Sequence, residues 1–139
     1  MLEKVHDHLV SELGQSSRTD TIFVITAIAF NLIILAVNSG TASASGSGRA
    51  SLGEDLIFFI FILVTLAINV IALTAIVLGR RSRVQLLQGL IDMYNDNDVA
   101  KYYSGKMLST YGRRYDLFTA VIGVLGATAI LVPLIIRFL

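Results

Sequence analysis

The sequence predicts an all-α integral membrane protein with three transmembrane helices, an N-terminal amphipathic helix and a cytoplasmic helical extension between the second and third spans. The 139-residue chain is 55% hydrophobic and only 15% charged, with a mean hydropathy of +0.74, whereas soluble domains carry about 25% charged residues. Three stretches remain uncharged over the roughly 20 helical residues that a bilayer requires. Helices are expected in all three because a helix satisfies its own backbone hydrogen bonds within lipid.

The positions of the charges divide the chain into segments. The uncharged stretches are enclosed by pairs of charged residues, which are Asp20 and Arg49, Asp55 and Arg80, and Asp116 and Arg137. A soluble bundle would need polar faces on these stretches, and they have none. We expect an amphipathic helix over 1–20, a first span over 21–38, an external Gly/Ser linker over 39–55, a second span over 56–79, a cytoplasmic helical hairpin over 80–116, a third span over 117–136 and an external tail over 137–139.

The N-terminal segment has helical periodicity. Its apolar residues recur three and four positions apart, at Leu2, Val5, Leu9 and Leu13. This helix could lie on the membrane surface or pack against the other cytoplasmic helices, and its weakly basic polar face favours packing. The acidic flank before the first span argues against a cleaved secretory signal, so we expect this span to be retained.

The distribution of basic residues predicts the topology. Three spans place the N-terminus and the loop 80–116 on one side, and of the 11 Lys and Arg residues only Arg49 and Arg137 fall on the other. The positive-inside rule then makes the N-terminus cytoplasmic and the C-terminus external. We favour the plasma membrane of a prokaryote over an organelle. The residues expected to anchor the helices at the interface are Arg80, Arg81, Arg83, Arg113, Arg114, Tyr111 and Tyr115.

The loop 80–116 is long enough to hold helices of its own. An apolar stripe at Val84, Leu87, Ile91 and Tyr94 predicts that the second helix continues beyond the membrane. The "NDND" at 95–98 should stop it, and Asp96 or Asn97 can cap the next helix. A calcium loop would need a glycine and a following glutamate that are missing here, so a turn is favoured over a cation site.

Two asparagines interrupt the apolar spans. Asn31 lies eleven residues after Asp20, and Asn69 lies eleven residues before Arg80, so both amides should lie about 16 Å deep in antiparallel helices. The surrounding sequences align at an offset of 38 residues, which suggests a duplication. Because hydrocarbon offers an amide no partner, both should face protein or water. An interhelical hydrogen bond that fixes the register is favoured over a polar constriction in a pore formed by several subunits.

Thr65 and Asn38 extend this polar stripe on the second and first spans. The third span instead has small residues three and four apart, at Ala120, Gly123 and Ala127, which predict a close helix–helix interface within the subunit or between copies. Three helices can hardly enclose both a polar face and a small-residue face. We therefore expect self-association.

No charged residue or histidine lies within any span, and the chain has no cysteine. This composition excludes thiolate catalysis and Cys-ligated metals, and His6 and His8 are too close in sequence to chelate one metal from a regular helix, so both are expected on a solvated face. We expect no enzyme activity, no catalytic residues, no cofactor and no metal site. The net charge of +1 argues against nucleic acid as a partner.

Two functional hypotheses remain. The first is a homo-oligomeric channel or pore, in which the asparagines line or brace the path. The alternative is a non-catalytic structural or accessory subunit of a larger membrane complex. The lipid bilayer is a partner in both, with further copies of the chain in the first and other membrane subunits in the second. A transporter is disfavoured because the spans contain no embedded charge and no interrupted helix.

Overall fold

Three long helices make up the computed structural model, which describes residues 2–45, 52–99, 101 and 107–139. They are α1 (Leu2–Ser45), α2 (Leu52–Asp96) and α3 (Met107–Phe138), and the described part of the chain contains no strand. Each helix is long and apolar enough to cross a membrane, judged by length and composition. The predicted all-helical class with three membrane-compatible helices is therefore confirmed.

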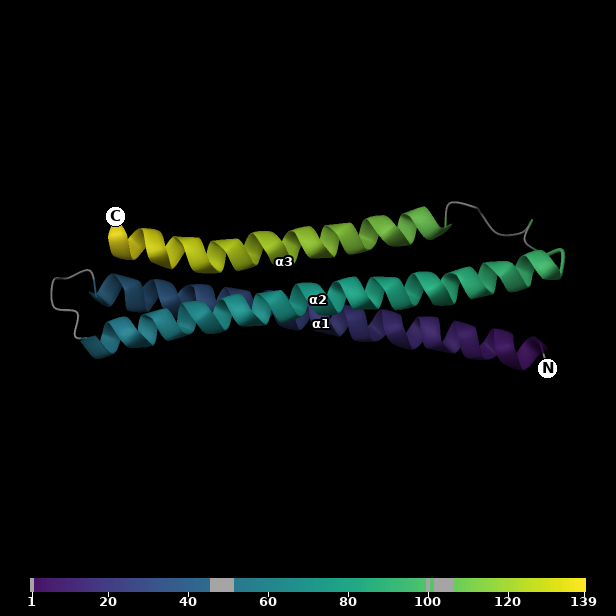
Figure 1. The fold of residues 1–139 in the computed structure, drawn as a ribbon, viewed down its shortest axis with the longest axis horizontal. Coiled ribbons are helices and arrows are strands. Elements are labelled where there is room, and N and C mark those ends of the chain that lie inside the picture. Colours follow the sequence, from purple (N-terminus) through teal and green to yellow (C-terminus); the bar gives the residue numbers. More distant parts are fainter. Residues whose placement is uncertain (1, 46–51, 100, 102–106) are drawn as a thin grey trace.

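The helices lie side by side as an elongated bundle (Figure 1). α1 and α2 run antiparallel and cross near their middles, α3 runs in the same direction as α1, and every helix packs against the other two. The N-terminus therefore lies at one end and the C-terminus at the other. We call these the arginine-rich end (2–20, 80–99 and 107–116) and the C-terminal end (38–45, 52–58 and 133–139).

The helices extend further than the sequence indicated. α1 is continuous over 44 residues and α2 over 45, which corresponds to about 66 Å each, against about 30 Å of hydrocarbon. The expected N-terminal helix is part of α1, and the expected linker 39–55 is helical up to Ser45 and again from Leu52. Propagating an existing helix costs little, and the hydroxyl groups of Thr41 and Ser43 donate back to backbone carbonyls within it.

The "NDND" sequence ends α2 through a Schellman motif. Asp98 has a positive φ of 56°, and the N–H groups of Asp98 and Val99 donate to the carbonyls of Asn95 and Tyr94. The side-chain amide of Asn97 also donates back, to Met93. The expected stop is therefore confirmed, with Asp96 as the last residue of α2 and Asn97 directly after it. The start of the helix that either residue was expected to cap falls on a stretch in which 100 and 102–106 lie outside the described residues, so the cap stays a prediction.

The apolar core occupies the part of the bundle next to the arginine-rich end. It contains Val24, Ala27, Ala72, Ile76, Tyr115 and Ile122. Outward-facing apolar side chains, in contrast, are widely exposed, including Ile25, Leu63 and Val124 at 61%, 68% and 66%. An exposed apolar surface of this extent marks a lipid- or protein-facing surface, which agrees with an integral membrane location.

Candidate functional site

The amides of Asn31 and Asn69 form a reciprocal pair between α1 and α2. The Nδ2 group of Asn31 donates to the side-chain Oδ1 of Asn69 at 3.0 Å, and the Nδ2 group of Asn69 donates to Oδ1 of Asn31 at 2.8 Å. Each amide uses its second N–H to donate to its own helix, at the carbonyls of Ala27 and Thr65. All four amide N–H groups are thus hydrogen-bonded. Both side chains are buried, with exposures of 2% and 7%.

The third helix closes over this amide pair at a glycine. A Cβ added to Gly126 would lie only 2.7 Å from Cγ of Asn69, which is closer than real Cβ contacts allow. Thr65, one turn from Asn69, is also fully buried and donates to the carbonyl of Phe61 at 2.7 Å. The polar stripe of α2 therefore faces the interior of the single chain.

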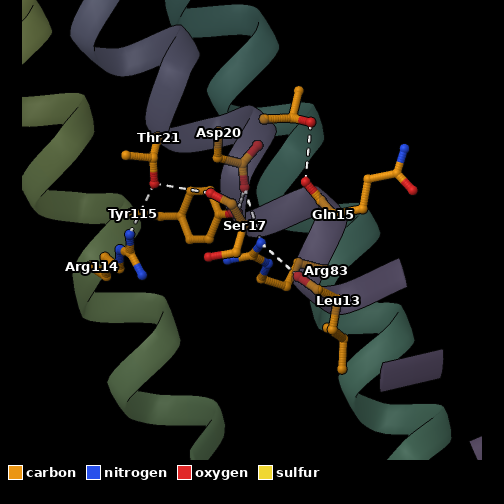
Figure 2. A network of polar contacts seen from close by, with 9 residues as sticks. Leu13, Gln15, Ser17, Asp20, Thr21, Arg83, Arg114 and Tyr115 are labelled. Atoms are coloured by element: carbon orange, nitrogen blue, oxygen red, sulfur yellow. Dashed lines mark hydrogen bonds and ion pairs between the residues drawn. The ribbon is translucent and has the colours of Figure 1, made fainter. Parts of the chain in front are cut away.

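A polar cluster joins the three helices at the arginine-rich end (Figure 2). The Tyr115 hydroxyl of α3 donates to the Asp20 carboxylate of α1, and Arg83 of α2 lies 3.5 Å from the same carboxylate. Arg83 is 2% exposed and also donates to the carbonyl of Leu13 at 3.3 Å. Gly79 allows this approach, because a Cβ there would lie 3.1 Å from Oδ1 of Asp20.

The surroundings of Tyr115 in this cluster favour its neutral form. Burial, reinforced by the hydrogen bond to Asp20, raises the pKa of the Tyr115 phenol above its usual value. The Arg83 guanidinium lies 5.7 Å from the Tyr115 ring centre and 5.8 Å from the Tyr111 ring centre, within cation–π range. Tyr115 and Arg83, expected as interfacial anchors, thus lie buried between helices.

The other predicted anchors remain at the surface. Arg80 pairs with Asp116 at 2.6 Å, and Arg114 donates to Thr21 and lies over the Phe118 ring. Arg81 and Arg113 are exposed, and Tyr111 is half-buried. In sequence, these residues lie next to the ends of the apolar segments 56–79 and 117–136.

A second ion pair closes the C-terminal end. Arg137 of α3 pairs with Asp55 of α2 and lies over the Phe58 ring at 5.1 Å. Arg137 is nearly buried, and its Nη1 has no hydrogen-bond partner among the described residues. Asp55, at the start of the second span, therefore holds α2 against α3.

Asn38 is the one predicted polar residue whose side chain is not satisfied. It is fully buried, yet neither its Nδ2 nor its Oδ1 has a hydrogen-bond partner within the described residues. The buried Pro133 of α3 has no N–H, which leaves the carbonyl of Ala129 without its helical donor. The interior of this end is thus polar and incompletely paired.

The small-residue stripe of α3 does not pack within the chain. Ala120 and Ala127 are exposed and Gly123 is half-buried, with nothing within 4 Å of a Cβ added there. The inward face of α3 uses Gly126, Ile122 and other buried residues instead. The interface between copies that this stripe predicts therefore stays a prediction.

The histidines occupy different environments. His6 shares a 2.9 Å hydrogen bond with Tyr94, which the long extension of α2 brings beside it, while the His6 side chain stays 38% exposed as expected of a solvated face. His8 is exposed. Over residues 2–45, 52–99, 101 and 107–139, no three His, Asp or Glu side chains gather closely enough to hold a metal ion.

Sequence reasoning missed Gly126, Gly79 and the pairing role of Asp20. No signal in one sequence distinguishes Gly126 from Gly123, because α3 is apolar on every face around both. Asp20 was identifiable only as the charge that ends an apolar segment.

Comparison with known proteins adds no assignment. No family model matches the chain, and searches of curated proteins and of solved structures return no significant match.

Proposed function

We propose that the protein is a non-catalytic structural or accessory subunit of a membrane assembly, in which its three helices act as one internally braced unit. The observation that supports this most directly is the Asn31–Asn69 pair. All four amide N–H groups are used within the chain, so none is left to solvate a passing ion or water. The amides then stabilise the packing of α1 against α2.

The outer surface of the spans supports the same proposal. The threonines exposed there, including Thr26, Thr74 and Thr128, donate their hydroxyl protons to carbonyls one turn earlier in the same helix. The three asparagines of the spans are all buried. Such a surface is suited to lipid or to another apolar helix, and it offers little to line an aqueous path.

The lengths of the helices suggest how such a subunit would meet its partners. α1 and α2 continue for roughly 20 residues beyond their apolar segments at the arginine-rich end. This gives a helical layer outside the membrane, while the exposed Ala120 and Ala127, with the half-buried Gly123 between them, give a close-approach face within it. A partner could therefore be bound at two levels.

That close-approach face favours a second candidate, the homo-oligomeric channel. Copies meeting along α3 would enclose a path between subunits, with the amide pair bracing its walls instead of lining them. The N-terminus would be cytoplasmic in both proposals, on the basis of the basic residues at the arginine-rich end.

Purified protein distinguishes the two candidates. For a structural subunit we expect a fixed partner to co-purify and ion flux in proteoliposomes to equal that of protein-free vesicles. Asn69→Leu should lower the free energy of unfolding in micelles by about 1–2 kcal/mol, because it leaves Asn31 buried without its partner. The double change Asn31→Leu and Asn69→Leu should recover part of this loss.

Thr74→Val provides the matched control, since Thr74 is exposed on α2 and bonds only to its own helix. A ring of copies in detergent together with flux that Asn69→Leu alters, but Thr74→Val does not, would reject the structural subunit and support the channel.

A further inference from the structure

An open hollow lies on the outer face of α2, where the apolar segment 56–79 meets the polar extension. It has a volume of about 460 Å³ and is lined by Val77, Arg80, Arg81, Val84 and Gln85. These positions recur three and four residues apart, so they share one helix face, and all are exposed. We infer that this hollow binds the headgroup of an anionic phospholipid.

The positive charge of Arg80 and Arg81 favours an anionic ligand. Arg80 is oriented by Asp116 at 2.6 Å and lies next to Gly112 of α3, but one carboxylate occupies only part of a guanidinium with five N–H donors. No ion pair joins Arg81 to an acidic side chain in the part of the chain that the structure describes. Two adjacent guanidinium groups with one carboxylate leave a surplus positive charge, and guanidinium binds phosphate with paired hydrogen bonds.

An apolar strip on the same face of α2, on the membrane side of the two arginines, favours a ligand with an acyl chain. The same helix face continues through Val77 to Val70, Leu66 and Leu63, which are exposed by 43%, 55%, 54% and 68%. An acyl chain lying on this strip would leave its phosphate at the level of Arg80 and Arg81. A soluble phosphate or an acidic protein segment would use the two charges but not the strip, so the combination favours a lipid.

The position of Arg80 along α2 matches the expected level of the lipid phosphates. Arg80 is the first charged residue after the apolar segment of α2, and lipid phosphates lie immediately outside the hydrocarbon layer. A basic side chain near an anionic membrane surface contributes about 1 kcal/mol of attraction. The inference rests on insertion of the apolar helices in a bilayer and not on either proposed function.

The test is lipid binding by the full chain in detergent micelles, measured by native mass spectrometry. The probes are phosphatidylglycerol and phosphatidylcholine with identical acyl chains. We expect the protein to prefer phosphatidylglycerol, and Arg81→Gln to reduce that preference about fivefold, which is the 1 kcal/mol expected of one arginine. Because Arg81 is exposed, this variant should keep the helix content of the native chain, checked by circular dichroism.

Arg18→Gln is the matched control. Arg18 is also exposed at the arginine-rich end, but it lines a different hollow with Ser11, Gly14 and Gln15. We expect this variant to bind both lipids as the native chain does. If Arg18→Gln reduces the preference as much as Arg81→Gln, overall charge explains binding and the site is rejected.

Three further outcomes overturn the inference. Equal binding of the two lipids would show that the hollow does not recognise charge. Displacement of phosphatidylglycerol by millimolar inorganic phosphate would show that the hollow takes soluble anions instead of a lipid. A chain that leaves the micelles altogether would reject membrane insertion, and with it both proposed functions, which is a different observation from lost selectivity.

Discussion

The two ends of the helix bundle each hold a largely buried arginine beside an aspartate and an aromatic ring, but their polar groups are paired to different extents. At the arginine-rich end, the Asp20 carboxylate contacts Arg83 and Tyr115, so one carboxylate joins all three helices. At the C-terminal end, Arg137 and Asp55 join only α2 and α3, and the buried amide of Asn38 has no partner in the described chain.

This difference shows where the bundle gains stability from polar groups. A buried charge must recover the free energy of leaving water, which it does only when several well-placed partners surround it. Arg83 has a carboxylate, a backbone carbonyl and two aromatic rings as partners, although its Nε has no hydrogen-bond partner in the part of the chain that the structure describes. The C-terminal end should therefore be the less stable one and the first to open.

The largest expected effect is that of replacing Arg83, and replacing Arg137 provides the comparison between the two ends. Arg83→Met leaves Asp20 without its cation in a largely buried position and should lower the free energy of unfolding by about 3 kcal/mol. Arg137→Met should cost about 1 kcal/mol, because Asp55 is 39% exposed and can be solvated. Denaturant unfolding in micelles measures both, with the exposed Arg81→Met as the control. Equal losses for the two variants would remove the proposed difference between the ends.

A change of opposite sign is expected at the C-terminal end. Asn38→Leu removes a buried amide that has no hydrogen-bond partner among the described residues, and should raise the free energy of unfolding by about 1 kcal/mol. Asn31→Leu, the control on the same helix, should lower it, because the paired Asn69 loses its partner. If Asn38→Leu is destabilising in the same unfolding assay, a buried water satisfies this amide and the two ends are equally well paired.

An effect of similar size, about 1 kcal/mol at neutral pH, is expected for Tyr115→Phe, which removes one hydrogen bond. The pH dependence of the stability that Tyr115 contributes is a more specific test of its role. Because the folded state raises the pKa of Tyr115, this contribution is complete below the unfolded pKa of about 10 and decreases as the pH rises further. Unfolding measured from pH 8 to 11 should show a decline in the native chain that Tyr115→Phe lacks. Parallel curves would mean that Tyr115 is not the group responsible.

The spans and the meeting of the amides could be predicted from sequence, because both follow from distances along helices. Asn31 and Asn69 lie equally far from the charges that end their spans, and in antiparallel helices equal depth makes contact possible. Which face of α3 turns inward could not be predicted, because its span is apolar all round; the structure uses Gly126 instead of Ala120, Gly123 and Ala127.

The burial of Arg83 could not be predicted for a related reason. Its position after an apolar segment is typical of an exposed interfacial anchor, and its burial depends on Asp20 and Tyr115 arriving from two other helices. The extent of α1 was also underestimated, because Gly/Ser composition indicates coil only where no neighbouring helix continues into it. Ala42, in the expected linker, is instead fully buried.

The unbroken course of α1 gives the molecule a mechanical property. A helix without a proline, an interruption or a change of direction behaves as a stiff rod, and α1 runs from Leu2 to Ser45 with Asn31 held against α2 between its ends. Because α1 is also fixed to α2 and α3 at Asp20, a sideways force on its first residues would be passed to both neighbouring helices and would displace the bundle as a unit.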